Sequence, residues 1–101
     1  MRIAQLYKDG ERFTAWPLRV TYMPTEGETQ VLVWAPKSLF KHAVKRNRIR
    51  RLMREAYRLN QNILDEQHFL IAFNYMDKEE QTFAVVDKAV CKALKKVKGE
   101  R

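Results

Sequence analysis

Positively charged side chains are concentrated between residues 37 and 58, where nine of the chain's 20 Lys and Arg residues lie. Glu55 is the only acidic residue in that stretch. Ammonium and guanidinium groups bind phosphate oxygens, and the planar arginine fork does so with two parallel hydrogen bonds. The stretch therefore predicts the binding of a polyanion. The side chains predicted to make this contact are Lys37, Lys41, Lys45, Arg46, Asn47, Arg48, Arg50, Arg51, Arg54 and Arg58.

Residues 43–58 are expected to form the helix that positions most of these side chains, because the stretch contains no Gly or Pro. At about 100° per residue, its apolar residues fall on one side. They are Ile49, Leu52, Met53, Ala56 and Leu59. The other side carries Arg50, Arg51, Arg54 and Arg58, with Asn47 among them. Such one-sided charge favours a nucleic-acid partner, because a solvated face normally mixes both signs of charge at spacings of three and four residues.

Groups that could catalyse a reaction are scarce. Cleavage of a phosphodiester needs metal ligands or a positioned acid and base. Glu55 is instead expected to pair with Arg51 or Arg58, one helical turn away. With one Cys and two His in the chain, there is no zinc-type spacing and no internal disulfide can form. The sequence therefore predicts no catalytic residue and no metal-binding residue.

Hydrophobic periodicity predicts the elements that hold this helix in place. We expect a short helix at residues 3–7, strands at 18–23 and 29–35, a strand at 68–75 that is apolar on both faces, and a helix at 83–98. The first two strands flank a turn rich in breakers and are expected to form an antiparallel hairpin. The predicted fold class is α+β, with element order α-β-β-α-β-α and a small sheet.

Length and composition bear on the number of domains, the kind of partner and the location of the protein. The chain has 101 residues, which indicates a single compact domain over residues 1–101. Its net charge of +8 favours attraction to nucleic acid or an acidic membrane surface. No apolar run approaches the length of a membrane-spanning helix, and the first residues do not have a signal-peptide pattern. We therefore expect no membrane association, a cytoplasmic location and no obligate protein partner.

The basic helix resembles the signature helix of a known family, the protein subunit of bacterial ribonuclease P. That signature reads approximately Ala-Val-x-Arg-Asn-Arg-hydrophobic-Lys/Arg-Arg-hydrophobic-hydrophobic-Arg-Glu-x-aromatic-Arg. The matching residues are Ala43, Val44, Arg46, Asn47, Arg48, Ile49, Arg50, Arg51, Leu52, Met53, Arg54, Glu55, Tyr57 and Arg58. The sequence departs from the family just before this match, because many members have a glycine where Phe40-Lys41-His42 stands here.

The resemblance implies a function, a set of partners and a fold. The family's holoenzyme is an endonuclease that removes the 5′ leader of precursor tRNA. Its catalytic RNA subunit supplies the active site and holds most of the Mg²⁺, while the protein binds that RNA and the leader. The resemblance also implies a left-handed crossover through the basic helix, as in domain 2 of ribosomal protein S5, whereas general rules favour a right-handed one.

A single-stranded leader would need aromatic rings for base stacking beside cations for the backbone. The resemblance suggests Tyr7 for one wall of a leader groove. The full set of groove candidates is Tyr7, Arg12, Phe13, Arg19, Tyr22 and Trp34. Each aromatic residue among them has an alternative structural role, because a small sheet must bury several large side chains.

Two other functions remain compatible with the charge pattern. One is a noncatalytic RNA-binding module, such as a small ribosomal protein or RNA chaperone. The other is a helix that reads duplex DNA, but the sequence shows neither a helix-turn-helix pair nor dimerising heptads. Cleavage of precursor tRNA with and without a catalytic RNA distinguishes these functions.

Overall fold

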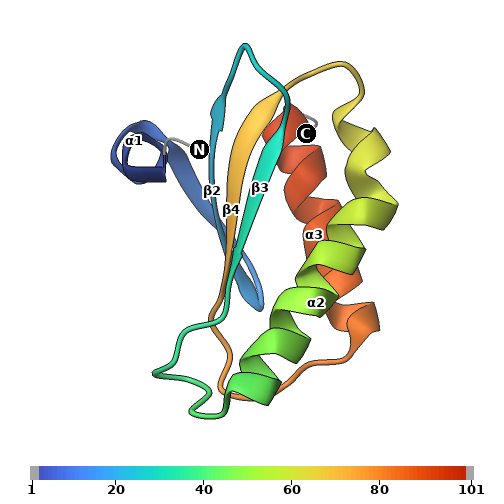
Figure 1. The fold of residues 1–101 in the computed structure, drawn as a ribbon. Coiled ribbons are helices and arrows are strands. Elements are labelled where there is room, and N and C mark those ends of the chain that lie inside the picture. The colour runs from blue at the N-terminus through green and yellow to red at the C-terminus, as the bar shows by residue number, and fades with distance from the viewer. Residues whose placement is uncertain (1–2, 100–101) are drawn as a thin grey trace.

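The computed structural model describes residues 3–99 and contains a four-stranded sheet covered by helices on both faces (Figure 1). Its elements are α1 (Ile3–Asp9), β1 (Glu11–Ala15), β2 (Leu18–Pro24), β3 (Gln30–Trp34), α2 (Ala43–Asn60), the 3-10 helix η1 (Gln61–Leu64), β4 (Phe69–Tyr75) and α3 (Phe83–Lys98). Helices α2 and α3 cover one face of the sheet, and α1 lies against the other (Figure 1). The predicted α+β class is confirmed.

The strand order, β1-β2-β4-β3, corrects two details of the sequence prediction. Strand β1 is absent from the predicted element order. The expected hairpin between residues 18–23 and 29–35 is wrong, because β4 lies between β2 and β3. Strand β2 pairs antiparallel with both β1 and β4, whereas β3 pairs parallel with β4. Parallel neighbours need a crossover connection, and α2 lies in that connection.

Strand β4 takes the central position because its side chains are apolar on both faces. Ile71 and Phe73, both 0% exposed, belong to the main core under α2 and α3. Leu70 and Ala72 point the other way and pack with Leu6 of α1 in a second, smaller cluster. A strand buried on both faces cannot lie at the edge of a sheet without exposing apolar surface to water.

Helix α1 and strand β1 meet at Gly10, whose backbone N–H donates to the Leu6 carbonyl at 2.8 Å. A Cβ atom at Gly10 would collide with the Leu6 carbonyl oxygen and lie 2.9 Å from the Tyr22 carbonyl oxygen. Glycine therefore allows the chain to turn closely from α1 into β1. This turn keeps Leu6 buried against the sheet, with 0% of its surface exposed.

The Tyr75 hydroxyl organises the connection from β4 to α3, and its loss gives a first testable prediction. It donates to the Glu79 carbonyl at 2.5 Å and accepts from the Gln81 N–H at 2.9 Å. Tyr75→Phe keeps the buried ring but leaves both backbone groups without this partner, so we expect a loss of about 1 to 3 kcal/mol in the free energy of unfolding. Urea denaturation measures this loss.

Tyr22→Phe is the matched control, because the Tyr22 hydroxyl donates to the exposed Glu11 side chain at 2.6 Å rather than to partly buried backbone groups. We expect it to change the free energy of unfolding by less than about 1 kcal/mol. Equal losses in the two variants would contradict the assigned role of Tyr75.

Candidate nucleic-acid interface

Helix α2 is fixed to the main core by one narrow stripe of side chains. Ile49, Met53 and Ala56 are each 0% exposed. Leu52 is half-buried against the same core, as predicted for the apolar side. The same prediction is wrong for Leu59, which is 52% exposed. Leu59 lies in the last turn of α2. There the next residue, Asn60, makes the contact with α3, because its side-chain amide donates a hydrogen bond to Asp87 at 2.7 Å.

The other side of α2 and the loop before it carry most of the predicted polyanion-binding residues in exposed positions. We call the exposed cations the basic surface: Lys37, Lys41, Lys45, Arg48, Arg51, Arg54 and Arg58. Asn47 is exposed among them, whereas Arg46 and Arg50 are half-buried. The structure therefore brings the predicted residues together on one helix and its preceding loop.

Most of the basic surface is free to bind an external anion. Within the basic surface, the side chains that make no hydrogen bond or ion pair to residues 3–99 are Lys37, Lys41, Lys45, Arg51 and Arg54. Arg48 forms an ion pair with Glu80 at 3.3 Å. Repulsion between unpaired neighbours on a helix costs a few tenths of a kcal/mol for each pair. A bound polyanion would remove that repulsion.

Two half-buried cations, Arg46 and Arg50, form hydrogen bonds within α2 and the loop before it. Arg46 donates to the carbonyl oxygens of Phe40 and Lys41, at 2.9 and 3.0 Å. These bonds fasten the connection from β3 to the first turns of α2, whose N-cap residue His42 supplies no side-chain hydrogen bond. Arg50 donates to the side-chain oxygen of Asn47. Arg46 therefore serves the local fold directly.

Glu55 pairs with Arg58, one of the two partners expected from the sequence, at 2.5 Å. The hydrogen bond from Arg58 is the main reason that the pKa of the Glu55 carboxyl lies below its ordinary value, and the positive charge of Arg58 adds to the effect. Glu55 therefore stays ionised at neutral pH. A carboxylate held in this way is a poor candidate for a general base.

The face of the sheet that carries α1 displays a second set of polar and aromatic groups, which we call the open sheet face. Strand pairing aligns Thr14, Arg19, Asn74 and Trp34 in one row across β1, β2, β4 and β3. Trp34 is 53% exposed. Four of the six predicted groove residues lie on this face: Tyr7, Arg12, Arg19 and Trp34.

Side-chain hydrogen bonds tie helix α1 to Asn74 of this row and to Arg12 of β1. The Tyr7 hydroxyl donates to the Asn74 side-chain oxygen at 3.2 Å, and the Arg12 guanidinium donates to the Tyr7 carbonyl. Asn74 and Thr14 were not predicted as site residues. Asn74 could have been found as the one polar side chain within the apolar strand, because alternation places it opposite Phe73 and Tyr75.

Phe13 and Tyr22 do not lie on the open sheet face, so the six predicted groove residues are divided between the two faces of the sheet. Both pack against the main core on the side of α2 and α3. Their rings meet edge to face at a centroid distance of 5.8 Å, and Tyr22 meets Phe69 in the same way at 6.1 Å. They are core aromatic residues because alternation along β1 and β2 turns them away from Arg12 and Arg19.

The basic surface and the open sheet face lie on opposite sides of the sheet and are connected at one end of the molecule. Trp34 is the last residue of β3, and residues 35–42 lead from it into α2. The end of β3 and the beginning of α2 lie at the same end of the ribbon (Figure 1). An RNA bound along α2 is therefore adjacent to the β3 edge of the open sheet face.

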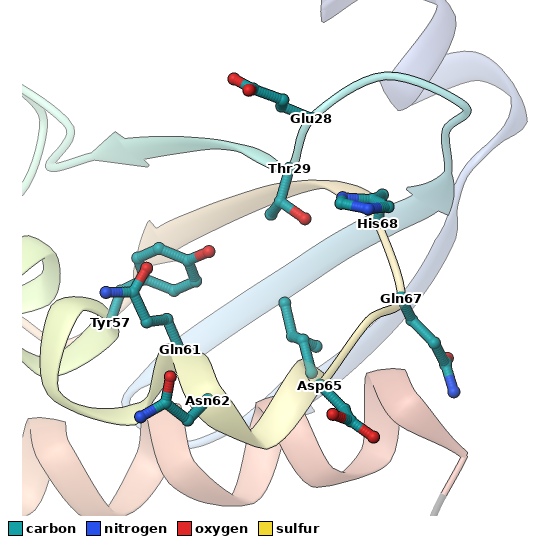
Figure 2. A pocket seen from close by; sticks show the side chains of 9 residues that line it. Glu28, Thr29, Tyr57, Gln61, Asn62, Asp65, Gln67 and His68 are labelled. Atoms are coloured by element: carbon teal, nitrogen blue, oxygen red, sulfur yellow. The ribbon is translucent and has the colours of Figure 1, made fainter.

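A polar recess of about 570 Å³ lies at the opposite end of α2. Figure 2 shows Tyr57 and Gln61 on one side of it, and Thr29 and His68 across from them. Its lining includes the acids Glu28 and Asp65 but neither Lys nor Arg. The recess therefore lacks the charge that a phosphate requires.

Residues 3–99 lack the features of two other kinds of site. They contain no group of three or more His, Cys, Asp or Glu placed to hold a metal ion. No helix among them is long and apolar enough to cross a membrane. The basic surface and the open sheet face consist mainly of cationic, amide and aromatic side chains.

Comparison with known proteins gives consistent matches in sequence. The model of the family described as Ribonuclease P matches residues 1–98. The ribonuclease P protein component of Porphyromonas gingivalis is 36% identical over 107 residues, covering 96% of this chain and 78% of the relative. That of Chlorobaculum tepidum is 41% identical over 69 residues, covering 61% of this chain and 45% of the relative.

Solved structures with the same fold are more distant in sequence. The ribonuclease P protein of Thermotoga maritima superposes with a TM-score of 0.82 at 19% identity, covering 94% of this chain and 90% of that one. The ribonuclease P protein of Staphylococcus aureus superposes with a TM-score of 0.79 at 17% identity, covering 96% of this chain and 88% of that one. The sequence matches, together with the shared fold and the filled signature on α2, establish that this chain belongs to the ribonuclease P protein family.

Proposed function

We propose that this chain acts as the protein subunit of ribonuclease P, binding the catalytic RNA subunit through the basic surface and the 5′ leader of precursor tRNA through the open sheet face. The observation that carries the proposal is the group of five unpaired cations on and before α2, in a chain of this family. Arg51 and Arg54 are the central members of that group.

Electrostatics supports the assignment of the basic surface to a structured RNA. Each phosphate neutralised by a fixed cation releases condensed counterions into solution, and this release favours binding. Helix α2 is seated on the core by Ile49, Met53 and Ala56, so the backbone that carries its cations is held in place before binding. Rigid placement lowers the entropy lost when the complex forms.

The open sheet face suits an unpaired strand better than a duplex. Trp34 offers an exposed ring on which a base can stack, and Arg12 and Arg19 supply charge for the backbone. Asn74 and Thr14 add groups that can form hydrogen bonds to sugars or base edges. A single-stranded leader that begins beside α2 meets these groups in order as it crosses the sheet.

Chemistry is assigned to the RNA subunit and to Mg²⁺ held by that RNA. The side chains of the interface do not fit a protein-held Mg²⁺ site, because the ion prefers clustered oxygen ligands and the basic surface presents cations. The protein contributes by reducing repulsion among RNA phosphates and by adding affinity for the leader. Both effects lower the Mg²⁺ and substrate concentrations that cleavage requires.

Reconstitution tests this proposal. We expect the purified protein to leave precursor tRNA intact, and protein plus catalytic RNA plus Mg²⁺ to cut at the mature 5′ end. The protein should lower the Mg²⁺ requirement for substrates with any leader, but should improve substrate affinity only when the leader is longer than one nucleotide. Cleavage rates across Mg²⁺ and substrate concentrations measure both effects.

Three results of this experiment would each overturn part of the proposal. RNA binding without any change in cleavage would favour the noncatalytic RNA-binding module. An affinity gain that does not depend on leader length would remove the leader role of the open sheet face. Cleavage by repurified, RNA-free protein would place a catalytic centre in this chain.

A further inference from the structure

Trp16 is a large aromatic residue to which the proposed interface gives no role. It lies in the turn between β1 and β2 and is 58% exposed, slightly more than Trp34. One exposed aromatic side chain is unremarkable on a protein surface. The surroundings of Trp16 are what distinguish it.

A recess of about 370 Å³ lies between Trp16 and helix α3. Thr14 and Trp16 line it from the hairpin, and Val85, Lys88, Ala89 and Lys92 line it from α3. No acidic residue contributes to the lining. The recess therefore combines an exposed indole ring, a small apolar area and two cations. Aromatic stacking beside positive charge is the combination that binds single-stranded nucleic acid.

The two cations belong to a row along α3. Lys88, Lys92 and Lys96 are spaced by four residues, so they lie on one side of the helix with about 6 Å between successive positions along its axis. The Lys96 ammonium lies 4.8 Å from the centroid of the Phe13 ring, which places the row beside β1. Within residues 3–99, Lys88 and Lys92 have no hydrogen bond or ion pair. An anionic strand would offset the repulsion within this row.

Thr14 joins this recess to the open sheet face. It lines the recess, and it also pairs with Arg19 at the end of the row that runs from Trp34 to β1. An RNA strand that crosses the sheet along this row leaves it over Thr14, beside Trp16. The two surfaces are therefore continuous around the β1 edge.

We propose that this recess is a distal subsite for the leader, in which an unpaired base stacks on Trp16 and neighbouring phosphates lie against Lys88 and Lys92. The inference rests on the proposed function, because it takes the leader to enter beside α2 at β3 and to leave over β1. Four strands at a spacing of about 4.8 Å span roughly 14 Å. Only a leader long enough to cross that width reaches the subsite. A hydrophobic peptide fits less well, because it would desolvate two ammonium groups without supplying an anion.

The test uses the holoenzyme assembled from the protein and its RNA subunit, with precursor tRNAs whose leaders are lengthened one nucleotide at a time. For the wild-type protein, we expect substrate affinity to rise when the leader reaches the open sheet face and again when it reaches Trp16. Trp16→Ala and the double variant Lys88→Gln/Lys92→Gln should each lose the second rise, on the order of tenfold, and keep the first. Lys95→Gln is the matched control, since Lys95 is exposed on α3 outside the recess, and it should keep both rises.

A spectroscopic readout separates contact from an indirect effect. The chain has two Trp residues, so Trp16 is the only one in a Trp34→Phe variant. Long leaders should quench its fluorescence and short leaders should not. Thermal denaturation of each variant checks that the fold is kept, as expected for exposed positions.

Each alternative outcome has a definite meaning. If Trp16→Ala keeps the second rise in substrate affinity, the distal subsite is refuted. The proposed function still stands in that case if the wild-type protein shows the first rise, at shorter leaders. If the wild-type protein shows no dependence on leader length, the leader role itself fails. If the variants weaken binding of the RNA subunit equally with or without substrate, the α3 edge contacts that RNA and the leader assignment is wrong.

Discussion

The double variant Arg51→Gln/Arg54→Gln will bind the catalytic RNA subunit roughly 60-fold more weakly at 0.1 M salt, because each lost phosphate contact removes about 0.9 from the slope of log affinity against log salt. Both side chains are exposed and, within the described part of the chain, make no hydrogen bond or ion pair. Gln has nearly the helix propensity of Arg, so α2 should be preserved. Binding titrations at several salt concentrations measure both the affinity and its slope.

The wild-type slope should be about −4.5 if all five unpaired cations neutralise phosphates, and the double variant should reduce its magnitude by about 1.8. Lys8→Gln/Lys95→Gln removes the same charge from exposed positions on α1 and α3 and should leave the slope near the wild-type value. Arg46 is left intact because it holds the carbonyls of Phe40 and Lys41. An unchanged slope in the Arg51/Arg54 variant would place the RNA on another surface.

Ile49→Ala will destabilise the domain by about 2 to 5 kcal/mol, since it removes a fully buried side chain from beneath the basic surface and leaves a cavity. Total stabilities of small domains are about 5 to 15 kcal/mol, so part of the population should unfold at moderate temperature. RNA binding should fall in proportion to the unfolded fraction. Urea denaturation followed by circular dichroism measures the free energy of unfolding.

Val44→Ala is the control for this change, because Val44 lies on the same helix but is 68% exposed. We expect it to alter the free energy of unfolding by less than about 0.5 kcal/mol. Similar stabilities for the Ile49 and Val44 variants would mean that α2 is seated through a different side.

Local patterns in the sequence predicted the elements well. Helix α2 was predicted from its apolar stripe, and Ile49, Met53 and Ala56 are the residues that the structure buries. Strand β4 was predicted to be central because it is apolar on both faces, which the sheet order confirms. In both cases a short stretch of chain is enough for the prediction, because burial on one or two faces of an element determines the spacing of its apolar residues.

Strand pairing was harder to predict because it depends on residues far apart in the chain. Consecutive strands are neighbours in most sheets, and that tendency favoured a hairpin between residues 18–23 and 29–35. Strand β4 instead separates them, and burying its two apolar faces requires that position. Strand β1 was missed because its five residues are mostly exposed and show little apolar alternation.

The six candidates for a leader groove do not share one face of the sheet, because the aromatic residues among them were chosen by chemical type. Alternation along residues 18–23 groups Tyr22 with Leu18 and Val20, opposite Arg19 and Thr21. That pattern already assigns Tyr22 to the core and Arg19 to the other face, as the structure shows. Phe13 could not be assigned in this way without a predicted strand at residues 11–15.

The position of β4 between β2 and β3 also determines when the protein becomes functional during its synthesis. Strand β3 has no partner in the sheet until residues 69–75 have left the ribosome, whereas β1 and β2 can pair as soon as both have been made. Helix α2 ends at Asn60, 15 residues before the end of β4, a delay of about one to three seconds at 5 to 20 residues per second. For at least that time the nascent chain carries its cationic segment without the core that positions it. Because α3 supplies Val86, Val90 and Leu94 to the same core, productive RNA binding begins only after α3 has been made as well.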